Sequence, residues 1–61
     1  MKYEFRNDDK TLIGHLETWD GVVTHTSKHL RHLEGVEFQF AVNAIKKKYA
    51  RFGDVVCSVT Q

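Results

Sequence analysis

The chain has 61 residues, a formal net charge of +1 and one cysteine. A domain of this length buries only about 60% of its unfolded surface, and a pocket that encloses a small molecule needs roughly 300 Å³. We therefore expect neither an enzyme nor a cofactor. The near-neutral charge argues against a nucleic-acid coat protein and against an acidic DNA mimic, and a single cysteine excludes an intramolecular disulfide.

Charged residues interrupt the apolar runs near the start of the chain, so we predict no signal peptide and no transmembrane helix. The chain begins with Met1 and contains no linker or repeat, from which we expect a complete single domain over residues 1–61. The cytoplasm is the expected compartment, because a lone cysteine and the absence of a leader are typical of cytoplasmic proteins.

Residues 2–6 and 11–18 alternate apolar with polar side chains, and a polar turn segment separates them. A period of two predicts two strands joined as a hairpin. In the second strand this alternation places Leu12 and Leu16 on one face and Ile13 on the opposite face.

Turn and cap signals follow the predicted hairpin. The Asp-Gly pair at 20–21 predicts a type I′ turn, since both positions tolerate positive φ, and the β-branched residues 22–24 favour a short third strand. Ser27 is a candidate N-cap for a short helix over residues 28–33. Gly35 is then expected to end that helix in the left-handed conformation.

Residues 37–52 carry the strongest helical signal. Their apolar side chains recur at spacings of three and four, which predicts one buried helix face: Phe38, Ala41, Val42, Ile45, Tyr49 and Phe52. Gly53 ends this helix, and residues 55–60 alternate as a last strand. The predicted fold class is α+β, an antiparallel sheet of about three or four strands with one long amphipathic helix packed on one face.

Three histidines are the only candidate metal ligands at a suitable spacing. On one continuous helix His25, His29 and His32 would share a face and could bind zinc with an open fourth position. The predicted helix start at Ser27 leaves His25 outside the helix, and no carboxylate or thiolate lies at a fitting spacing. We therefore expect surface histidines and no metal site.

No catalytic residue is predicted. A nucleophilic cysteine needs a neighbouring base or a positive field, but Cys57 alternates with Val55 and Val59 and is expected to point into the core as a small hydrophobic residue. The glycines stand alone, which excludes a glycine-rich phosphate loop.

Basic residues gather near the end of the predicted long helix: Lys46, Lys47, Lys48 and Arg51. Such a face could contact phosphates, or it could be a solvated surface that complements the helix dipole. A helix-turn-helix formed by residues 27–33, a turn over 34–36 and a recognition helix over 37–52 is a variant of the first alternative. Glu37, at the start of its recognition helix, would repel phosphate.

Apolar side chains exceed what one small core can hold. Trp19 flanks the predicted turn, Phe40 lies off the buried stripe of the long helix, and Ile13 and Val56 oppose the core faces of their strands. Exposed aromatic and aliphatic side chains near basic residues are typical anchors of protein interfaces. The alternative is that Trp19 and Phe40 close the ends of the core.

Two segments in the C-terminal half form a recognisable pattern of helix followed by strand: Gln39-Phe40-Ala41-Val42-Asn43 and Val56-Cys57-Ser58-Val59. In this pattern the chain resembles the Dmd antitoxin family of T4-type bacteriophages. The resemblance implies a phage-encoded inhibitor that docks onto a host toxin or defence nuclease and blocks its active site. It transfers no role to a single residue, and the first half of the chain does not match.

Together these features predict a small non-enzymatic inhibitor or adaptor, encoded by a phage or mobile element, that occludes a host defence protein such as a toxin, nuclease or CRISPR effector. The predicted contact residues are Trp19, Phe40, Lys46, Lys47, Lys48 and Arg51. Direct nucleic-acid binding by the basic helix face is the alternative. An exposed strand edge or the free face of the sheet could also support a homodimer.

Overall fold

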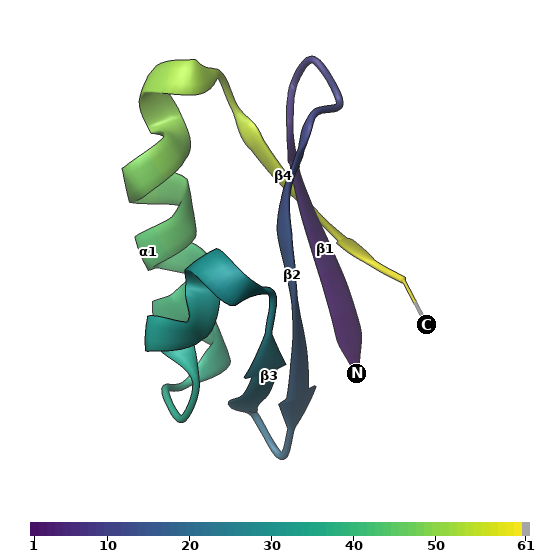
Figure 1. Cartoon of the computed structure of the whole chain (residues 1–61), viewed down its shortest axis with the longest axis vertical. Coiled ribbons are helices and arrows are strands. Elements are labelled where there is room, and N and C mark those ends of the chain that lie inside the picture. Colours follow the sequence, from purple (N-terminus) through teal and green to yellow (C-terminus); the bar gives the residue numbers. More distant parts are fainter. Residues whose placement is uncertain (61) are drawn as a thin grey trace.

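Four antiparallel strands form one sheet in the order β3-β2-β1-β4. The computed structural model describes residues 1–60, except for the side chain of Phe52. In chain order the elements are β1 (Lys2–Asn7), β2 (Leu12–Trp19), β3 (Val22–Thr26), the 3₁₀ helix η1 (Lys28–Leu33), α1 (Phe38–Tyr49), the 3₁₀ helix η2 (Ala50–Phe52) and β4 (Val55–Val59). Both α1 and η1 lie on the same face of the sheet (Figure 1). The predicted α+β fold is confirmed.

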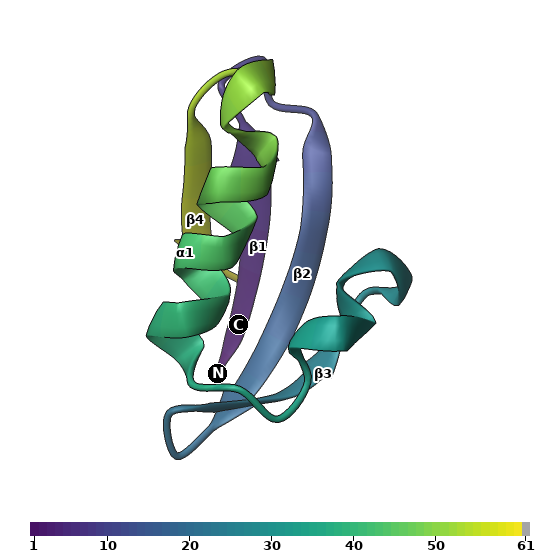
Figure 2. The ribbon, with the colours of Figure 1, turned by 90° about the vertical axis from the view of Figure 1, so that its left-hand side faces the viewer.

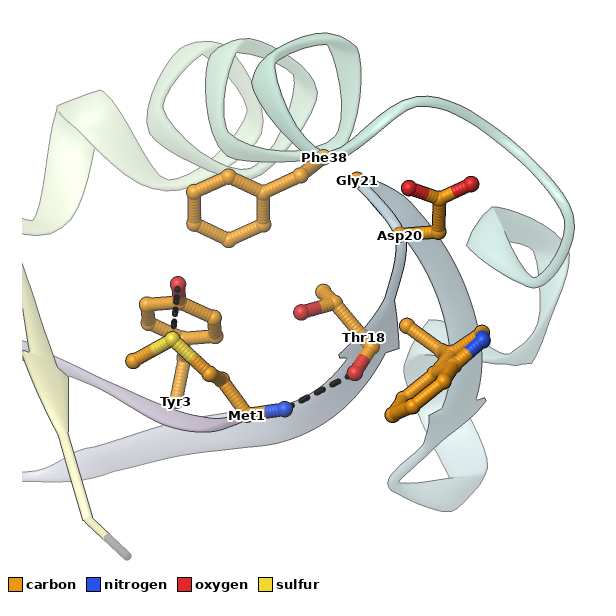
Figure 3. A pocket seen from close by; sticks show the side chains of 7 residues that line it. Met1, Tyr3, Thr18, Asp20, Gly21 and Phe38 are labelled. Atoms are coloured by element: carbon orange, nitrogen blue, oxygen red, sulfur yellow. Dashed lines mark hydrogen bonds between the residues drawn. The ribbon is translucent and has the colours of Figure 1, made fainter.

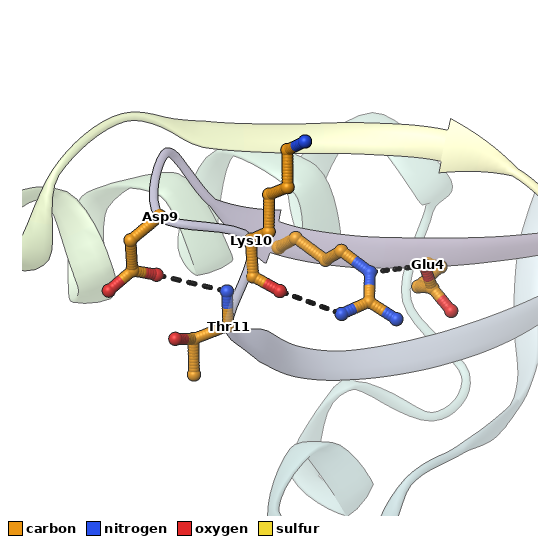
Figure 4. Close-up of polar contacts among 5 residues, drawn as sticks. Glu4, Asp9, Lys10 and Thr11 are labelled. Carbon is orange, nitrogen blue, oxygen red and sulfur yellow. Dashed lines mark hydrogen bonds and ion pairs between the residues drawn. The ribbon is translucent and has the colours of Figure 1, made fainter.

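A tight turn joins β1 to β2, and polar contacts hold it. The Lys10 N–H donates to the Asn7 carbonyl at 2.9 Å, and Lys10 itself adopts a positive φ of 70°. The carboxylate of Asp9 accepts from the Thr11 N–H at 2.9 Å (Figure 4). Two hydrogen bonds lower the pKa of Asp9. The one from the Thr11 side chain has the larger effect, and the one from the Thr11 backbone has the smaller effect. Arg6 donates to the Lys10 carbonyl and so ties the strand to its own turn.

The predicted turn between β2 and β3 is confirmed. Asp20 and Gly21 have φ values of 53° and 79°, and Trp19 pairs directly with Val22 across them. Positive φ at both central residues is the signature of a type I′ turn. The third strand extends beyond the predicted residues to Thr26.

A β-bulge in β2 overturns the predicted faces of that strand. Phe5 pairs with Gly14, but the next residue of β1, Arg6, pairs with Leu12, which leaves Ile13 as an extra residue. An extra residue shifts the alternation of side chains by one position. Ile13 is therefore buried, 7% exposed, whereas Leu12 is 50% exposed. The prediction that Leu12 and Leu16 share a face is wrong.

The short helix is present at the predicted residues, but as a 3₁₀ helix, and Ser27 does not cap it with its side chain. The Ser27 hydroxyl instead accepts from the His15 N–H at 3.2 Å, while the Ser27 N–H donates to the His15 carbonyl at 3.0 Å. Because the hydroxyl is engaged by β2, it is not available to the first turn of η1. Gly35 follows with a φ of 88°, as predicted.

The long helix is shorter than predicted, because residues 50–52 form a 3₁₀ turn. Its buried side chains are Ala41, Val42 and Ile45, and they join a core that draws on β1, β2, β3 and η1: Phe5, Ile13, Leu16, Val23, Leu30 and Leu33. When the helix faces the viewer, α1 runs along β1 and β4, and η1 lies beside β3 (Figure 2). Phe52, the last member of the predicted stripe, has its side chain outside the described part. No helix within residues 1–60 is long and apolar enough to cross a membrane.

Candidate protein-binding surface

The core is complete without the most exposed aromatic side chains. Trp19 is 78% exposed and Phe40 is 62% exposed, and neither belongs to the buried cluster. Both are therefore surface residues and do not close the ends of the core. The exposed part of an apolar side chain contributes no burial free energy to folding, so that part of each ring remains available to a partner.

Phe40 projects from the side of α1 that faces away from the sheet. The buried face of α1 contains Ala41, which is 0% exposed, together with Val42 and Ile45. Successive helical residues are rotated by about 100°, so the Phe40 side chain lies on the opposite side of the helix from this face. Two hollows flank the ring: one of about 400 Å³ lined with Val36 and Glu37, and one of about 360 Å³ lined with residues of the next turns. We define the Phe40 surface as the residues that line these hollows: Val36, Glu37, Phe40, Asn43, Ala44 and Lys47.

The predicted basic residues do not form a single face. Successive residues of an α-helix are rotated by about 100°, so three consecutive lysines point in three directions. Lys47 lies on the Phe40 surface, Lys46 acts electrostatically on the Cys57 thiol of β4, and the Lys48 ammonium lies 5.7 Å from the centre of the Tyr49 ring. Arg51 is exposed in η2, beyond the end of the helix. These residues surround the C-terminal end of α1.

Trp19 lies on a different layer from Phe40. Its neighbour Thr18 pairs with Val23, which is 1% exposed and faces the core. Trp19 pairs with Val22, which is 40% exposed, so this pair faces the side of the sheet that α1 and η1 leave open. The predicted contact residues are thus divided between the sheet and the helix.

A hollow of about 340 Å³ lies at the same end of the sheet, with Trp19 in its wall. Tyr3 and Phe38 stack there with ring centres 4.3 Å apart, and the Tyr3 hydroxyl donates to the Met1 sulfur (Figure 3). The Met1 ammonium donates to the Thr18 carbonyl at 2.8 Å. The wall is mainly apolar, and it also carries the Asp20 carboxylate and the Thr18 hydroxyl.

The three histidines of the metal hypothesis lie on two elements. His25 is in β3, where its ring nitrogen contacts the Thr24 hydroxyl at 3.3 Å. His29 and His32 are in η1, and the Nε2 of His29 contacts the Ile13 carbonyl. Within residues 1–60 no group of three ligating side chains is placed to hold a metal ion.

The helix-turn-helix variant does not fit the structure. Its first helix is the short 3₁₀ helix η1, and the intervening residues bond to a strand: the Val23 N–H donates to the Val36 carbonyl at 2.9 Å, and the Gly35 N–H donates to the Val23 carbonyl at 2.8 Å. The turn is thereby part of the sheet, so α1 does not stand free as a recognition helix.

Cys57 is half-buried and packs against the core, as predicted. Burial raises the pKa of its thiol above the ordinary value, and nearby Lys46 opposes that rise. The thiolate is the reactive form of cysteine. The site therefore disfavours the form that a nucleophile requires.

We expect slow alkylation of Cys57 by iodoacetamide near pH 7, with the rate rising only above the pH at which an unstructured cysteine peptide reacts. The raised pKa keeps the thiol protonated over that interval. The rate should be measured against pH in buffer and in denaturant, which removes the burial. A folded protein that reacts at lower pH than the denatured one would contradict this assignment.

The sequence contains one signal for the Phe40 surface. Phe40, Asn43, Ala44 and Lys47 follow the spacing i, i+3, i+4 and i+7, which places them on one helix face by the same rule that located the buried stripe. The contributions of Val36 and Glu37 could not be found in this way, because they precede the helix and reach Phe40 only through the fold.

Comparison with protein-family models, with curated proteins and with solved structures finds no match to this chain. The resemblance to the phage antitoxin family thus stays a prediction.

Proposed function

We propose that this chain is a small protein-binding inhibitor or adaptor, which docks on a partner protein through the Phe40 surface and blocks it by steric occlusion. The exposed ring of Phe40 between two hollows is the observation that carries the proposal. Phage or mobile-element origin and a host defence protein as the partner follow from the sequence resemblance and belong to the same proposal. Action in the cytoplasm also belongs to it, on the basis of the lone cysteine.

The size of the Phe40 side chain favours a role as an anchor. Transferring a phenylalanine side chain from water to an apolar pocket contributes about 1.5–3 kcal/mol. Few other single contacts on a surface of this size supply as much, and interface energy is concentrated in such residues. The hollows beside the ring give a partner room to close around it.

The charges around Phe40 favour a particular kind of partner. Glu37 lies at one side of the Phe40 surface and Lys47 at the other, and Lys46, Lys48 and Arg51 extend the positive charge at the end of α1. A partner with an acidic rim beside an apolar groove complements this arrangement. Such charges mainly accelerate association and select the partner.

A capture experiment with matched variants tests the proposal. We expect the tagged protein to retain a stoichiometric bacterial protein, and Phe40→Ala to weaken that binding by about tenfold to a hundredfold, in line with loss of an aromatic anchor. Leu12→Ala is the matched control, because Leu12 is 50% exposed but lies on β2, away from α1. The same binding measurement with Trp19→Ala tests separately whether the partner also contacts the sheet.

Two outcomes would overturn the proposal. Equal binding by the wild type, Phe40→Ala and Leu12→Ala would show that the Phe40 surface is not the contact. Retention of DNA or RNA alone, with an affinity that falls steeply as salt is added, would favour the nucleic-acid alternative.

A further inference from the structure

The two edge strands of the sheet, β3 and β4, differ in how far other segments of the chain cover them. At the β3 edge, residues 35–38 cover the strand: the Val23 N–H donates to the Val36 carbonyl, the Gly35 N–H donates to the Val23 carbonyl, and the Phe38 N–H donates to the Gly21 carbonyl. These bonds occupy the outward backbone groups of Gly21 and Val23, and so they block the addition of a new strand at the start of β3.

The β4 edge is open, because β4 is the last strand of the sheet and pairs only with β1. The Thr60 N–H donates to the Lys2 carbonyl, and hydrogen-bonding direction alternates along an antiparallel strand. The N–H and C=O groups of Val55, Cys57 and Val59 therefore point outward from the sheet. They form a row of unpaired donors and acceptors within the described part of the chain.

This edge lacks the features that keep exposed strands apart. Proteins protect edges with charged residues, proline or bulges. The strand β4 has the sequence Val-Val-Cys-Ser-Val, with no charge and no proline, and its pairing with β1 continues without a register shift. Val56 and Val59 are 52% and 55% exposed.

The sequence of β4 is complementary to itself about Cys57, and we propose that a second copy of this chain binds there, with the two β4 strands antiparallel and Cys57 opposite Cys57. In that register Val55 faces Val59 of the second copy on the helix side of the sheet. Val56 faces Ser58 of the second copy on the open side. Every outward N–H and C=O group of residues 55, 57 and 59 then has a partner, and the two sheets become one.

The helix adds surface to this contact. Gln39, Asn43 and Lys46 are spaced four and three residues apart and share one side of α1. Lys46 acts on the Cys57 thiol, which places that side toward β4, and Figure 2 shows α1 running along β1 and β4. Two copies related by a two-fold axis at Cys57 thus bring their α1 helices side by side.

This contribution is needed for a stable dimer. A specific interface buries roughly 800 Å² on each partner, and the whole accessible surface of one copy is 4319 Å². A ladder of five residues covers only part of that requirement. Asn43 belongs to both this side of α1 and the Phe40 surface, but the strand ladder itself uses only β4. Variants at Val59 therefore test the dimer, and Phe40→Ala tests the proposed function separately.

Sedimentation equilibrium of the full chain tests the proposal, with concentrations up to the millimolar range. We expect a reversible dimer. Val59→Pro should raise the dissociation constant by about tenfold or more, because it removes an outward N–H in both copies while the bonds from β4 to β1 stay intact. Val59→Glu should also weaken the dimer. Leu12→Glu, the same change on a comparably exposed residue of the interior strand β2, should not.

The register is tested in a mixture of isotope-labelled and unlabelled protein. We expect an intermolecular contact between the Hα of Val56 and the Hα of Ser58 in the second copy, since facing residues that do not exchange hydrogen bonds have the closest Cα atoms. Circular dichroism checks that each variant remains folded. A protein that stays monomeric, a dimer unchanged by both Val59 variants, or intermolecular contacts elsewhere would overturn the proposal.

Discussion

Phe5→Ala is expected to unfold much of the protein at 25 °C, whereas Phe40→Ala is expected to change the free energy of unfolding by no more than about 0.5 kcal/mol. Phe5 is 0% exposed on a central strand, between Gly14 of β2 and Cys57 of β4. Truncating a buried phenylalanine costs about 3–5 kcal/mol. A domain of this length has a total stability of about 3–9 kcal/mol.

Urea denaturation followed by far-ultraviolet circular dichroism measures both variants. The comparison is informative because the same substitution is made at two phenylalanines that differ mainly in exposure, 0% for Phe5 and 62% for Phe40. A loss of more than about 2 kcal/mol in Phe40→Ala would be typical of a core residue. That outcome would remove the basis of the proposed function.

Gly53→Ala is expected to destabilise the protein by about 2–4 kcal/mol, from backbone strain and steric overlap together. Gly53 has φ 110° and ψ 179°, a region that only glycine occupies readily. An added Cβ would also lie 2.4 Å from a carboxylate oxygen of Asp8 in the β1–β2 turn. Because the Asp8 side chain is exposed and can rotate away, the backbone conformation is the main reason that this position favours glycine.

The double variant Asp8→Ala/Gly53→Ala separates the two causes. Removing the carboxylate relieves the steric overlap but not the backbone strain, so we expect partial recovery relative to Gly53→Ala. Asp8→Ala alone is the control, and Gly21→Ala is a second one, since Gly21 has φ 79° but open space around its Cβ position. A Gly53→Ala protein as stable as the wild type in thermal unfolding would contradict the assigned conformation.

The small size of the core explains why several apolar side chains remain exposed to solvent. A short chain can bury one face of one sheet against one helical layer. That layer is filled here by Ala41, Val42 and Ile45 of α1 together with Leu30 and Leu33 of η1. Phe40 has no place in that layer. Phe40 therefore adds little to the core, and it lies beside Lys47 and Glu37 on the surface. An exposed aromatic side chain next to charged residues is typical of an interface anchor.

Local patterns in the sequence were enough to predict most elements of the fold. The period of two located the strands, the period of 3.6 located α1, and the Asp-Gly pair located the type I′ turn. These signals depend on residues close together in the chain. The same kind of signal places Phe40 off the buried stripe, and the ring is exposed in the structure.

Tertiary structure decided what depends on distant residues. Whether Ile13 is buried depends on the pairing of β2 with β1, since the bulge arises where Phe5 meets Gly14 and Arg6 meets Leu12. The hydrogen bond of the Ser27 hydroxyl depends likewise on β2. This hydroxyl accepts from the His15 N–H and does not cap the first turn of η1. Neither partner could be identified from local sequence.

The separation of the predicted contact residues also required the fold. The sequence by itself determined that this is a small α+β domain with more apolar side chains than its core can hold. Only the tertiary structure placed Trp19 on the sheet and Phe40 on the helix, covered the start of the β3 edge with residues 35–38 and left the β4 edge open. The physical reason is that periodicity determines which way a side chain points within its element, whereas the packing of elements determines what lies there.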